Sequence, residues 1–282
     1  MYKSGNKKSL LGLHVKASEQ GLPLNTLVAE FMHIVALDAV FSLFESDKIC
    51  FQGGTSIHLL HGGYRYSEDL DFAGPQIDQE ASRKIVEKSR SSIEKGMIQL
   101  LGYGESEWRL SRRFANPRVF SHWYIFRPQG YRQKFRLKME FGQYAVYETK
   151  VYPVRSELDP FNRQTLVNGL KPKELLVEKV NAAIGRPYFK GRDIFDIWYL
   201  SEVLKTPWDP ELMSKKLHDY GLKPDRENVE NKLRMISPEL LANEMNRFLP
   251  QRYRRQLEAQ GYREIRESGV SVVRQALTSV WS

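Results

Sequence analysis

The sequence predicts an α/β protein of the α+β type, in which a mixed sheet with flanking helices precedes an all-helical C-terminal half. Two observations carry this prediction. Between residues 48 and 154, short runs alternate apolar and polar residues, as strands with one buried face do. From about residue 173 the apolar residues recur at helical spacing. The break at residues 156–169 divides the chain into a predicted catalytic domain with N-terminal helices, residues 1–160, and a helical domain, residues 161–282.

The first half begins with a helix over residues 25–45, whose apolar residues share one face. A second long helix is predicted over residues 78–101, with Asp78 as its N-cap. The clearest strand is residues 134–141, where Phe, Leu, Met and Phe alternate with Lys, Arg, Lys and Glu. The predicted strands are residues 48–51, 107–114, 119–126, 134–141 and 149–154.

The second half contains helical patterns separated by proline-containing or polar segments. The predicted helices are residues 173–184, 194–204, 210–220, 238–248 and a long stretch from residue 250.

Composition limits the class of protein. The 282 residues are 41% hydrophobic and 12% aromatic, which excludes a disordered chain and allows a sizeable core. No apolar run approaches the roughly 20 residues that span a bilayer, and the N-terminus lacks the pattern of a signal peptide. The single cysteine, Cys50, lies in an apolar strand and is interpreted as a buried residue. We therefore expect a cytoplasmic protein with no membrane partner.

The most informative stretch begins with Gly53, Gly54 and Thr55, directly after a predicted strand. The glycines allow the backbone to approach phosphate oxygens closely, and the N–H groups at a helix start favour an anion. Thr55 is predicted to cap a short helix that ends near residue 62. A simple strand-to-helix turn is the alternative interpretation of the glycine pair.

Asp69 and Asp71 follow within twenty residues, and they alternate with Leu70 and Phe72. In an extended segment the two carboxylates share one face, while the apolar residues anchor the other. Two carboxylates so placed are typical ligands for Mg²⁺, or for Mn²⁺, when the metal shares its oxygen ligands with substrate phosphates. The pattern predicts a site for transfer of a phosphoryl or nucleotidyl group; two surface acids are the alternative.

These residues resemble the signature of the AbiEii/MenT group of nucleotidyltransferase toxins: Gly53-Gly54-Thr55, then the run Arg-Tyr-Ser-Glu-Asp-Leu-Asp-Phe at residues 65–72. A second match contains Lys179, Arg186 and the run Arg-Asp-Ile-Phe-Asp at residues 192–196. The resemblance spans roughly residues 24–200. It implies a nucleotidyltransferase-like fold, an NTP substrate contacted by Lys179, and an active-site role for Asp193.

Further candidates come from the residues themselves. Glu140 lies on the polar face of its strand, where it is either a third metal ligand or the counter-charge of Arg136 or Lys138. Lys179 falls inside the apolar arc of its helix, so it needs an anionic partner such as a triphosphate, unless it extends along the domain edge to water. Asp193 either caps its helix or orients Lys179 or the attacking hydroxyl.

Polar residues beside these candidates complete the predicted site. Arg65 either contacts phosphate or clamps the loop that precedes the carboxylates, and Ser67 hydrogen-bonds the loop backbone. Arg186 and Arg192 flank a loop that is expected to carry positive charge near phosphate, and Arg192 alternatively forms an ion pair with Asp196 one helical turn on. His58 and His61 have no further histidine or cysteine ligands close by in the sequence, so a zinc site is not expected there.

The net charge of +9 favours a polyanionic partner. Arginines interleave with aromatic residues in two regions, a pattern that suits RNA but is also that of solvated helix or strand faces. The arginines of the two regions are Arg112, Arg113 and Arg118, and Arg252, Arg254 and Arg255.

The predicted function is a metal-dependent nucleotidyltransferase. The resemblance implies an RNA acceptor, the 3′ end of a tRNA, and a toxin of a toxin–antitoxin or phage-defence system with a cognate antitoxin protein. Two alternatives stay open: transfer to a protein side chain, and a nucleotide- or RNA-binding module without turnover.

Overall fold

The computed structural model of the chain describes residues 5–110, 116–156, 164–259 and 261–281. The chain forms two compact units. The sheet unit comprises Met1–Gly62 and Tyr66–Gly169, and the helical unit comprises Gly63–Arg65 and Leu170–Ser282.

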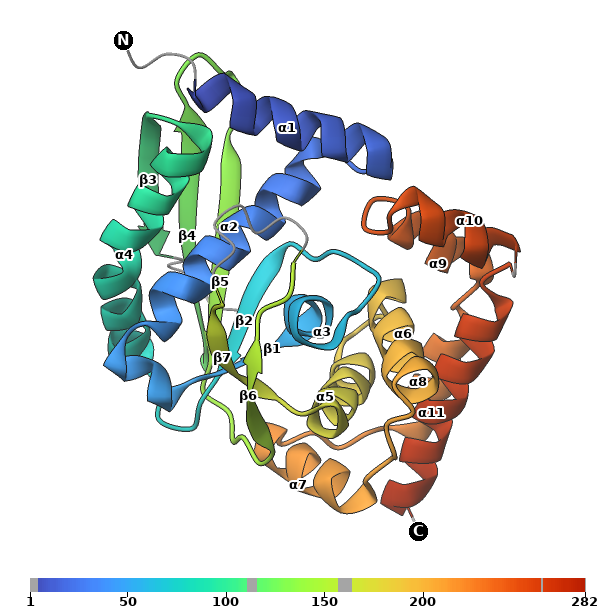
Figure 1. Cartoon of the computed structure of the whole chain (residues 1–282). Coiled ribbons are helices and arrows are strands. Elements are labelled where there is room, and N and C mark those ends of the chain that lie inside the picture. Colours follow the sequence, from blue (N-terminus) through green and yellow to red (C-terminus); the bar gives the residue numbers. More distant parts are fainter. Residues whose placement is uncertain (1–4, 111–115, 157–163, 260, 282) are drawn as a thin grey trace. The chain divides into compact units, whose positions relative to one another are not determined.

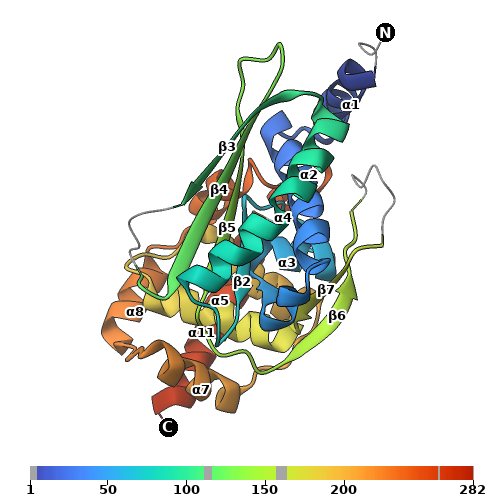
Figure 2. The same cartoon turned by 90° about the vertical axis from the view of Figure 1, so that its left-hand side faces the viewer.

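The sheet unit is built on one seven-stranded mixed sheet with the strand order β3-β4-β5-β2-β1-β7-β6 (Figures 1 and 2). Two neighbouring pairs are parallel, β2 with β5 and β1 with β7. The pairs β1–β2, β3–β4 and β4–β5 are antiparallel. The strands are β1 (Cys50–Gln52), β2 (Asp69–Ala73), β3 (Gly104–Leu110), β4 (Val119–Pro128), β5 (Phe135–Gly142), β6 (Thr149–Pro153) and β7 (Leu166–Leu170).

Helices cover the apolar face of this sheet. Helices α2 and α4 pack against each other, α2 on β5 and α4 on β3 and β4. The predicted alternation of the central strands is confirmed, since Leu70, Phe72, Leu137, Met139 and Phe141 are all at most 1% exposed. The helices of this unit are α1 (Gly5–Gln20), α2 (Leu24–Phe41), η1 (Phe44–Lys48), α3 (Gly53–His61) and α4 (Gln79–Leu101).

Helix α2 corrects one expectation from composition. It is 18 residues long and apolar enough to cross a membrane by length and composition, although no apolar run of that kind was expected. Its burial indicates another role, because 67% of the helix lies inside the protein and its residues Val28, Phe31 and Met32 belong to the main core. These features are those of a core helix.

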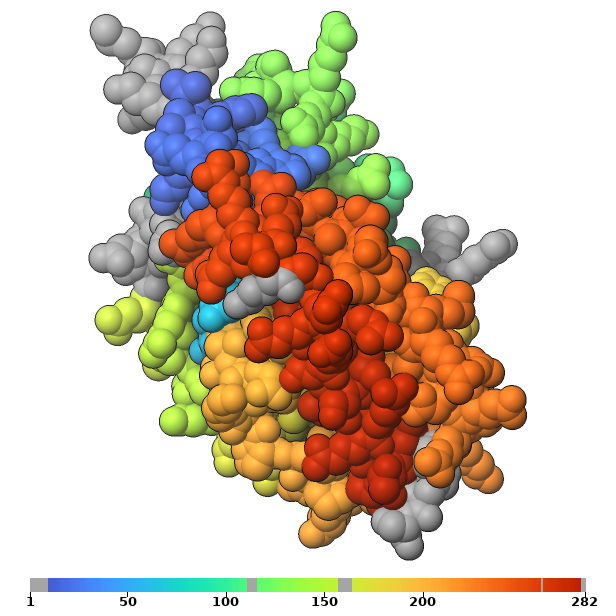
Figure 3. Space-filling model, turned by 90° about the vertical axis from the view of Figure 1, so that its right-hand side faces the viewer, coloured from blue at the N-terminus to red at the C-terminus, as the bar shows by residue number. Residues whose placement is uncertain are grey.

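The helical unit is a set of packed helices, with α11 in contact with α5, α6, α7 and α9. Figure 3 shows α10 and α11 on one face of this unit. The elements are α5 (Pro172–Gly185), α6 (Gly191–Trp198), the π-helical turn η2 (Tyr199–Val203), α7 (Pro210–Tyr220), α8 (Arg226–Arg234), α9 (Pro238–Met245), α10 (Gln251–Ala259) and α11 (Arg263–Trp281).

Several boundaries and elements differ from the sequence expectations. Strand β7 lies in the segment that was expected to be a break, and α8 was not expected. The helix predicted over residues 194–204 begins earlier, at Gly191, and changes to π-helical geometry at Tyr199. The expected N-cap of α4 is confirmed, because the Asp78 carboxylate accepts a hydrogen bond from the N–H of Ala81 at 2.7 Å. Cys50 is buried, as expected.

Candidate active site

Strand β2 places the two predicted carboxylates on the polar face of the sheet. Asp69 and Asp71 are both partly exposed, while Leu70 between them is fully buried. On the adjacent parallel strand, Asp69 is in register with Lys138 and Asp71 with Glu140. The expected pairing of carboxylates on one face is therefore present, and a lysine and a glutamate lie beside it.

Gly53 makes room for the second carboxylate. A Cβ atom at this position would lie 2.1 Å from Oδ2 of Asp71, and the backbone has a positive φ of 79° that favours glycine. The glycine therefore allows the backbone of residue 53 to lie close to the Asp71 carboxylate. Helix α3 begins here, so the N–H groups of its first turn lie beside the carboxylate strand.

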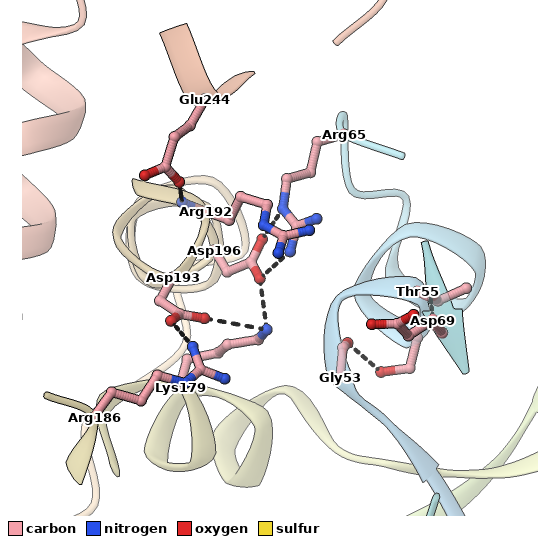
Figure 4. Close-up of polar contacts among 11 residues, drawn as sticks. Gly53, Thr55, Arg65, Asp69, Lys179, Arg186, Arg192, Asp193, Asp196 and Glu244 are labelled. Atoms are coloured by element: carbon pink, nitrogen blue, oxygen red, sulfur yellow. Dashed lines mark hydrogen bonds and ion pairs between the residues drawn. The ribbon is translucent and has the colours of Figure 1, made fainter. Parts of the chain in front are cut away.

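Thr55 has a role that differs from the expected cap. The N-cap position of α3 is Gln52, and Thr55 lies inside the helix, almost fully buried. Its hydroxyl donates a hydrogen bond to the backbone carbonyl of Asp69 at 2.5 Å (Figure 4). Thr55 therefore fixes the start of β2.

His33 on α2 holds the preceding residue, which the sequence did not indicate. Its Nε2 lies 3.1 Å from the backbone carbonyl of Glu68. Burial lowers the pKa of His33 to about 4, so the ring is neutral at pH 7 and Nε2 carries the hydrogen that it donates. Two consecutive carbonyls, those of Glu68 and Asp69, are thus held by buried side chains.

Glu140 shows the second of its two predicted interpretations. Its carboxylate pairs with Lys138 at 2.9 Å and accepts a hydrogen bond from the hydroxyl of Ser121 at 2.8 Å. Burial by itself lowers the pKa of Lys138, but the hydrogen bond to Glu140 and the nearby charges of Asp69, Glu140 and Asp71 raise it overall.

The donor set of this site fits a hard divalent cation. Asp69 and Asp71 present carboxylate oxygens on one face, and the missing Cβ of Gly53 leaves room for the Asp71 carboxylate. Among the residues that the structure describes, no three His, Cys, Asp or Glu side chains are grouped closely enough to hold a metal. The pair is therefore the core of the candidate metal site.

The helical unit contains a second group of predicted residues, centred on Asp196 (Figure 4). The Asp196 carboxylate accepts hydrogen bonds from Nε of Arg65 at 2.6 Å and from Nη2 at 2.5 Å. Nζ of Lys179 lies 2.8 Å from the same carboxylate. Arg65 is 4% exposed and Asp196 is 1% exposed, so this is a buried ion-pair network. The network was not predicted, because Arg65 and Asp196 are far apart in the sequence.

Lys179 faces inward, as its position on the helix predicted. Its side chain is only 12% exposed, which contradicts extension along the domain edge to water. The required anion is supplied within the chain, by Asp196 and by Asp193 at 3.8 Å. Burial by itself raises the pKa of Asp196, but the charges of Arg65 and Lys179 lower it overall, so the carboxylate is ionised at neutral pH.

Asp193 does not cap its helix. Helix α6 begins at Gly191 with Lys190 as the N-cap residue, and no side chain makes a capping hydrogen bond. Asp193 is buried and pairs with Arg186 as well as with Lys179. At the start of the same helix, the backbone N–H of Arg192 donates a hydrogen bond to the Glu244 carboxylate at 3.3 Å. Asp193 thus contributes to the position of Lys179, as one of its two interpretations predicted.

The remaining predicted residues are dispersed. Ser67 is partly exposed in the loop before β2, and Gly54 is buried in α3. His58 pairs with Glu30 at 2.8 Å, and His61 packs edge-on against Tyr152.

The basic regions are only partly described. Arg112 and Arg113 lie outside the described residues, and Arg118 is exposed directly before β4. Arg252 and Arg255 are exposed on α10, with Arg254 between them partly exposed.

Comparisons with known proteins give the family of the chain and the relatives of its fold. The family model "Nucleotidyl transferase AbiEii toxin, Type IV TA system" matches residues 36–277. The fold is similar to that of MenT4, a nucleotidyltransferase toxin from Mycobacterium tuberculosis H37Rv, with a TM-score of 0.56, 14% identity, and coverage of 99% of this chain and 98% of that chain. It is also similar to JHP933 from Helicobacter pylori, with a TM-score of 0.52, 15% identity, and coverage of 92% and 97%. No curated protein matches the chain.

Proposed function

The chain belongs to the AbiEii family of nucleotidyltransferase toxins, and from this premise we propose that it transfers a nucleoside monophosphate from an NTP to the 3′ end of an RNA, specifically a tRNA. The observation that most supports the proposal is the carboxylate pair Asp69 and Asp71 on β2, with Asp71 against Gly53 at the start of α3. This places anion-binding N–H groups next to metal-binding carboxylates.

The proposed reaction is a displacement at the α-phosphorus. The 3′-oxygen of the acceptor forms a bond to the α-phosphorus, and the bond from that phosphorus to the oxygen bridging the β-phosphate breaks. The electron pair of the broken bond leaves with pyrophosphate, and the hydroxyl proton passes to solvent. Mg²⁺, or Mn²⁺, neutralises charge on the phosphates when it is bound.

Residues of the sheet unit hold and orient the reacting groups in this proposal. Asp69 and Asp71 are the metal ligands, and Glu140 becomes a third ligand only if it gives up its ion pair with Lys138. Gly53, Gly54 and the first turn of α3 bind the triphosphate through backbone N–H groups, while Thr55 keeps Asp69 in place.

Residues of the helical unit supply positive charge in this proposal. Lys179 contacts the nucleotide, and Asp193 and Asp196 fix the direction of its ammonium group. Arg65 acts on the site through Asp196, because two of its guanidinium nitrogens donate to that carboxylate. Lys179 therefore reaches the substrate as a preorganised charge.

The proposal includes a cellular role, which the family match supports without testing its details. The chain acts in the cytoplasm as the toxin of a type IV toxin–antitoxin pair with a role in phage defence, and a cognate antitoxin protein neutralises it.

One experiment separates RNA from the two alternatives. Purified protein is incubated with Mg²⁺ and each of the four α-labelled NTPs, with bulk tRNA in one set and bulk protein in another. Label that enters tRNA supports the proposal. Label that enters only protein favours transfer to a side chain, and binding of NTP or RNA without any transfer favours a binding module.

Substitution of Lys179 tests the nucleotide contact. Lys179→Met keeps the length of the side chain and removes its charge, so we expect KM for NTP to rise by roughly 10- to 150-fold, the equivalent of one charge-assisted hydrogen bond. The free energy of unfolding should fall by about 1–3 kcal/mol, because Asp196 and Asp193 lose a partner but keep Arg65 and Arg186.

Lys173→Met is the matched control on the same helix. Lys173 pairs with Asp209 at 3.0 Å and is 31% exposed, so its loss should leave KM for NTP unchanged. Steady-state kinetics with varied NTP gives the comparison. Equal KM values for Lys179→Met and the parent would assign Lys179 a purely structural role.

Salt dependence tests the RNA acceptor. Each arginine that contacts a phosphate releases counterions, so activity on tRNA should fall steeply between low and moderate salt, while NTP binding falls much less. The triple variant Arg252→Glu, Arg254→Glu, Arg255→Glu should raise KM for tRNA and leave KM for NTP unchanged.

The equivalent variant of Arg112, Arg113 and Arg118 tests the second basic region in the same way. Kinetics at several salt concentrations measures both effects. If both triple variants modify tRNA as well as the parent does at physiological salt, neither region is the path of the RNA.

A further inference from the structure

A cavity of about 440 Å³ opens beside Asp69, entirely within the sheet unit. Its volume lies in the range of about 300–1,000 Å³ that is typical of small-molecule sites. The wall contains the start of β2, the start of β5, the first turns of α2 and the ring of Trp123 on β4. Ser67, Glu68 and Asp69 of the carboxylate motif line one side of it, and the rest of the wall comes from residues outside the motifs.

Three adjacent strands align the functional groups of the cavity in one row. Asp69 on β2 is in register with Lys138 on β5, and Lys138 is in register with Trp123 on β4. The three side chains therefore share the polar face of the sheet. The ammonium nitrogen of Lys138 lies 5.4 Å from the centroid of the Trp123 ring. A carboxylate, a cation and an aromatic ring thus follow one another across the wall.

The mouth of the cavity is basic. Lys134 directly before β5 and Arg136 within it are both exposed and line the cavity, and together with Lys138 they outnumber the acidic lining residues Glu68 and Asp69. Asn25 and Thr26 come from the first turn of α2, where the partial positive charge of a helix start favours an anion. An aromatic ring with clustered cations is the combination that binds single-stranded nucleic acid, because the base stacks and the phosphates are neutralised.

The topology separates this cavity from the glycine motif. In the sheet, β2 lies between β1 on one side and β5 on the other. Gly53 and α3 follow β1, whereas Trp123 and Lys138 lie on the β5 side. If the triphosphate occupies the side of β2 that carries the glycine motif, the opposite side is left for the acceptor, with Asp69 adjacent to it.

We propose that this cavity binds the 3′-terminal nucleotide of the acceptor RNA, with its base on Trp123, its phosphate on Lys134 and Arg136, and its 3′-hydroxyl toward Asp69. The inference rests on the proposed function, since it assigns the acceptor position of the same site. It is a different site from the two arginine-rich regions, which are proposed as separate RNA contacts.

The test measures RNA binding without NTP, so that it is independent of turnover. The probe is a short single-stranded oligoribonucleotide with a 5′-fluorescein label, and fluorescence anisotropy gives its Kd for the full-length protein. Trp123→Ala should raise Kd by roughly 5- to 150-fold, which is the loss of one stacked base. Trp123→Phe keeps an aromatic face and should bind nearly as tightly as the parent.

A second pair of variants tests the mouth without touching the core. Lys134→Gln with Arg136→Gln should lower the slope of log K against log salt by about 1.4, the equivalent of two phosphate contacts on a single strand. Arg83→Gln with Lys84→Gln removes the same charge from the exposed face of α4 and should leave the slope unchanged.

The outcomes are distinct. A parent-like Kd for Trp123→Ala together with a parent-like salt slope for the Lys134 and Arg136 variant would overturn the assignment. A rise in KM for NTP instead of RNA would assign the cavity to the nucleotide and overturn it as well. If the parent modifies no RNA, the proposed function fails, and the anisotropy measurement still decides whether the cavity binds RNA.

Discussion

Asp69→Asn and Asp71→Asn are each expected to lower kcat for nucleotidyl transfer by at least about 10²- to 10³-fold. Each substitution removes a charged ligand of the metal, and the metal would stabilise the negative charge of the transition state. Asparagine keeps the volume of the side chain, so Gly53 still has room beside position 71. The melting temperature without metal should stay near that of the parent, since both positions are partly exposed. Mg²⁺ should stabilise the parent against heat and should stabilise neither variant.

The control is Asp47→Asn, an exposed carboxylate in η1 of the same unit. It removes the same charge and should leave both kcat and the effect of Mg²⁺ unchanged. Initial rates with saturating NTP and RNA, with thermal unfolding at several Mg²⁺ concentrations, give both readouts. Retention of more than about a tenth of the parent kcat in either site variant would show that its carboxylate is not required as a metal ligand.

Lys216→Met should have the largest effect on stability. Nζ of Lys216 on α7 lies 2.6 Å from both Glu174 and Glu178 on α5, and the lysine is 1% exposed while Glu174 is fully buried. Methionine matches the length of lysine but leaves two carboxylates without their cation. Breaking a buried ion pair in this way costs about 3–5 kcal/mol, so the helical unit should unfold at clearly lower denaturant.

The pH dependence has a definite sign. Burial by itself lowers the pKa of Lys216, but the charges of Glu178 and Glu174 raise it above its ordinary value of 10.5. The stabilisation by Lys216 is therefore complete below pH 10.5 and is lost as the pH rises through the raised pKa. The difference between parent and variant should be constant near neutrality and shrink in strong alkali.

Lys215→Met is the control for this variant. Lys215 is the preceding residue, pairs with Glu211 at 2.7 Å on the helix surface, and is 50% exposed. Its loss should cost less than about 1 kcal/mol. Urea unfolding followed by circular dichroism compares the three proteins. Equal midpoints for the two variants would mean that the buried cluster adds no more stability than a surface pair.

The sheet and most helices were predictable where the burial pattern is simple. Strand β5 buries every second residue, and the sequence alternates accordingly. Strand β7 has no such signal, because its five residues include Asn168 and Gly169, and the side chain of Leu60 packs closely on Gly169. Helix α8 buries only Val229 and Leu233, so its pattern is dominated by charge.

The candidate site was predictable in its residues but not in its connections. The pattern of glycines and carboxylates gave the positions, since those depend on local spacing. The pairing of Arg65 with Asp196 joins residues 131 positions apart, and the bond from Thr55 to Asp69 depends on how α3 packs on β2. Likewise, the alignment of Trp123 with Lys138 depends on strand register, which the spacing of residues along one strand does not specify.

Residues Gly63–Arg65 belong to the helical unit, although the chain on both sides of them belongs to the sheet unit. Arg65 is fixed there by Asp196, and Tyr64 stacks on Tyr253 with 4.4 Å between ring centroids. The chain thus passes between the units three times, after Gly62, after Arg65 and after Gly169. A fragment that ends near residue 169 therefore carries two side chains whose partners it lacks. The C-terminal half is consequently not an exchangeable module, and a chimera between homologues has to take residues 63–65 and the C-terminal half from the same parent.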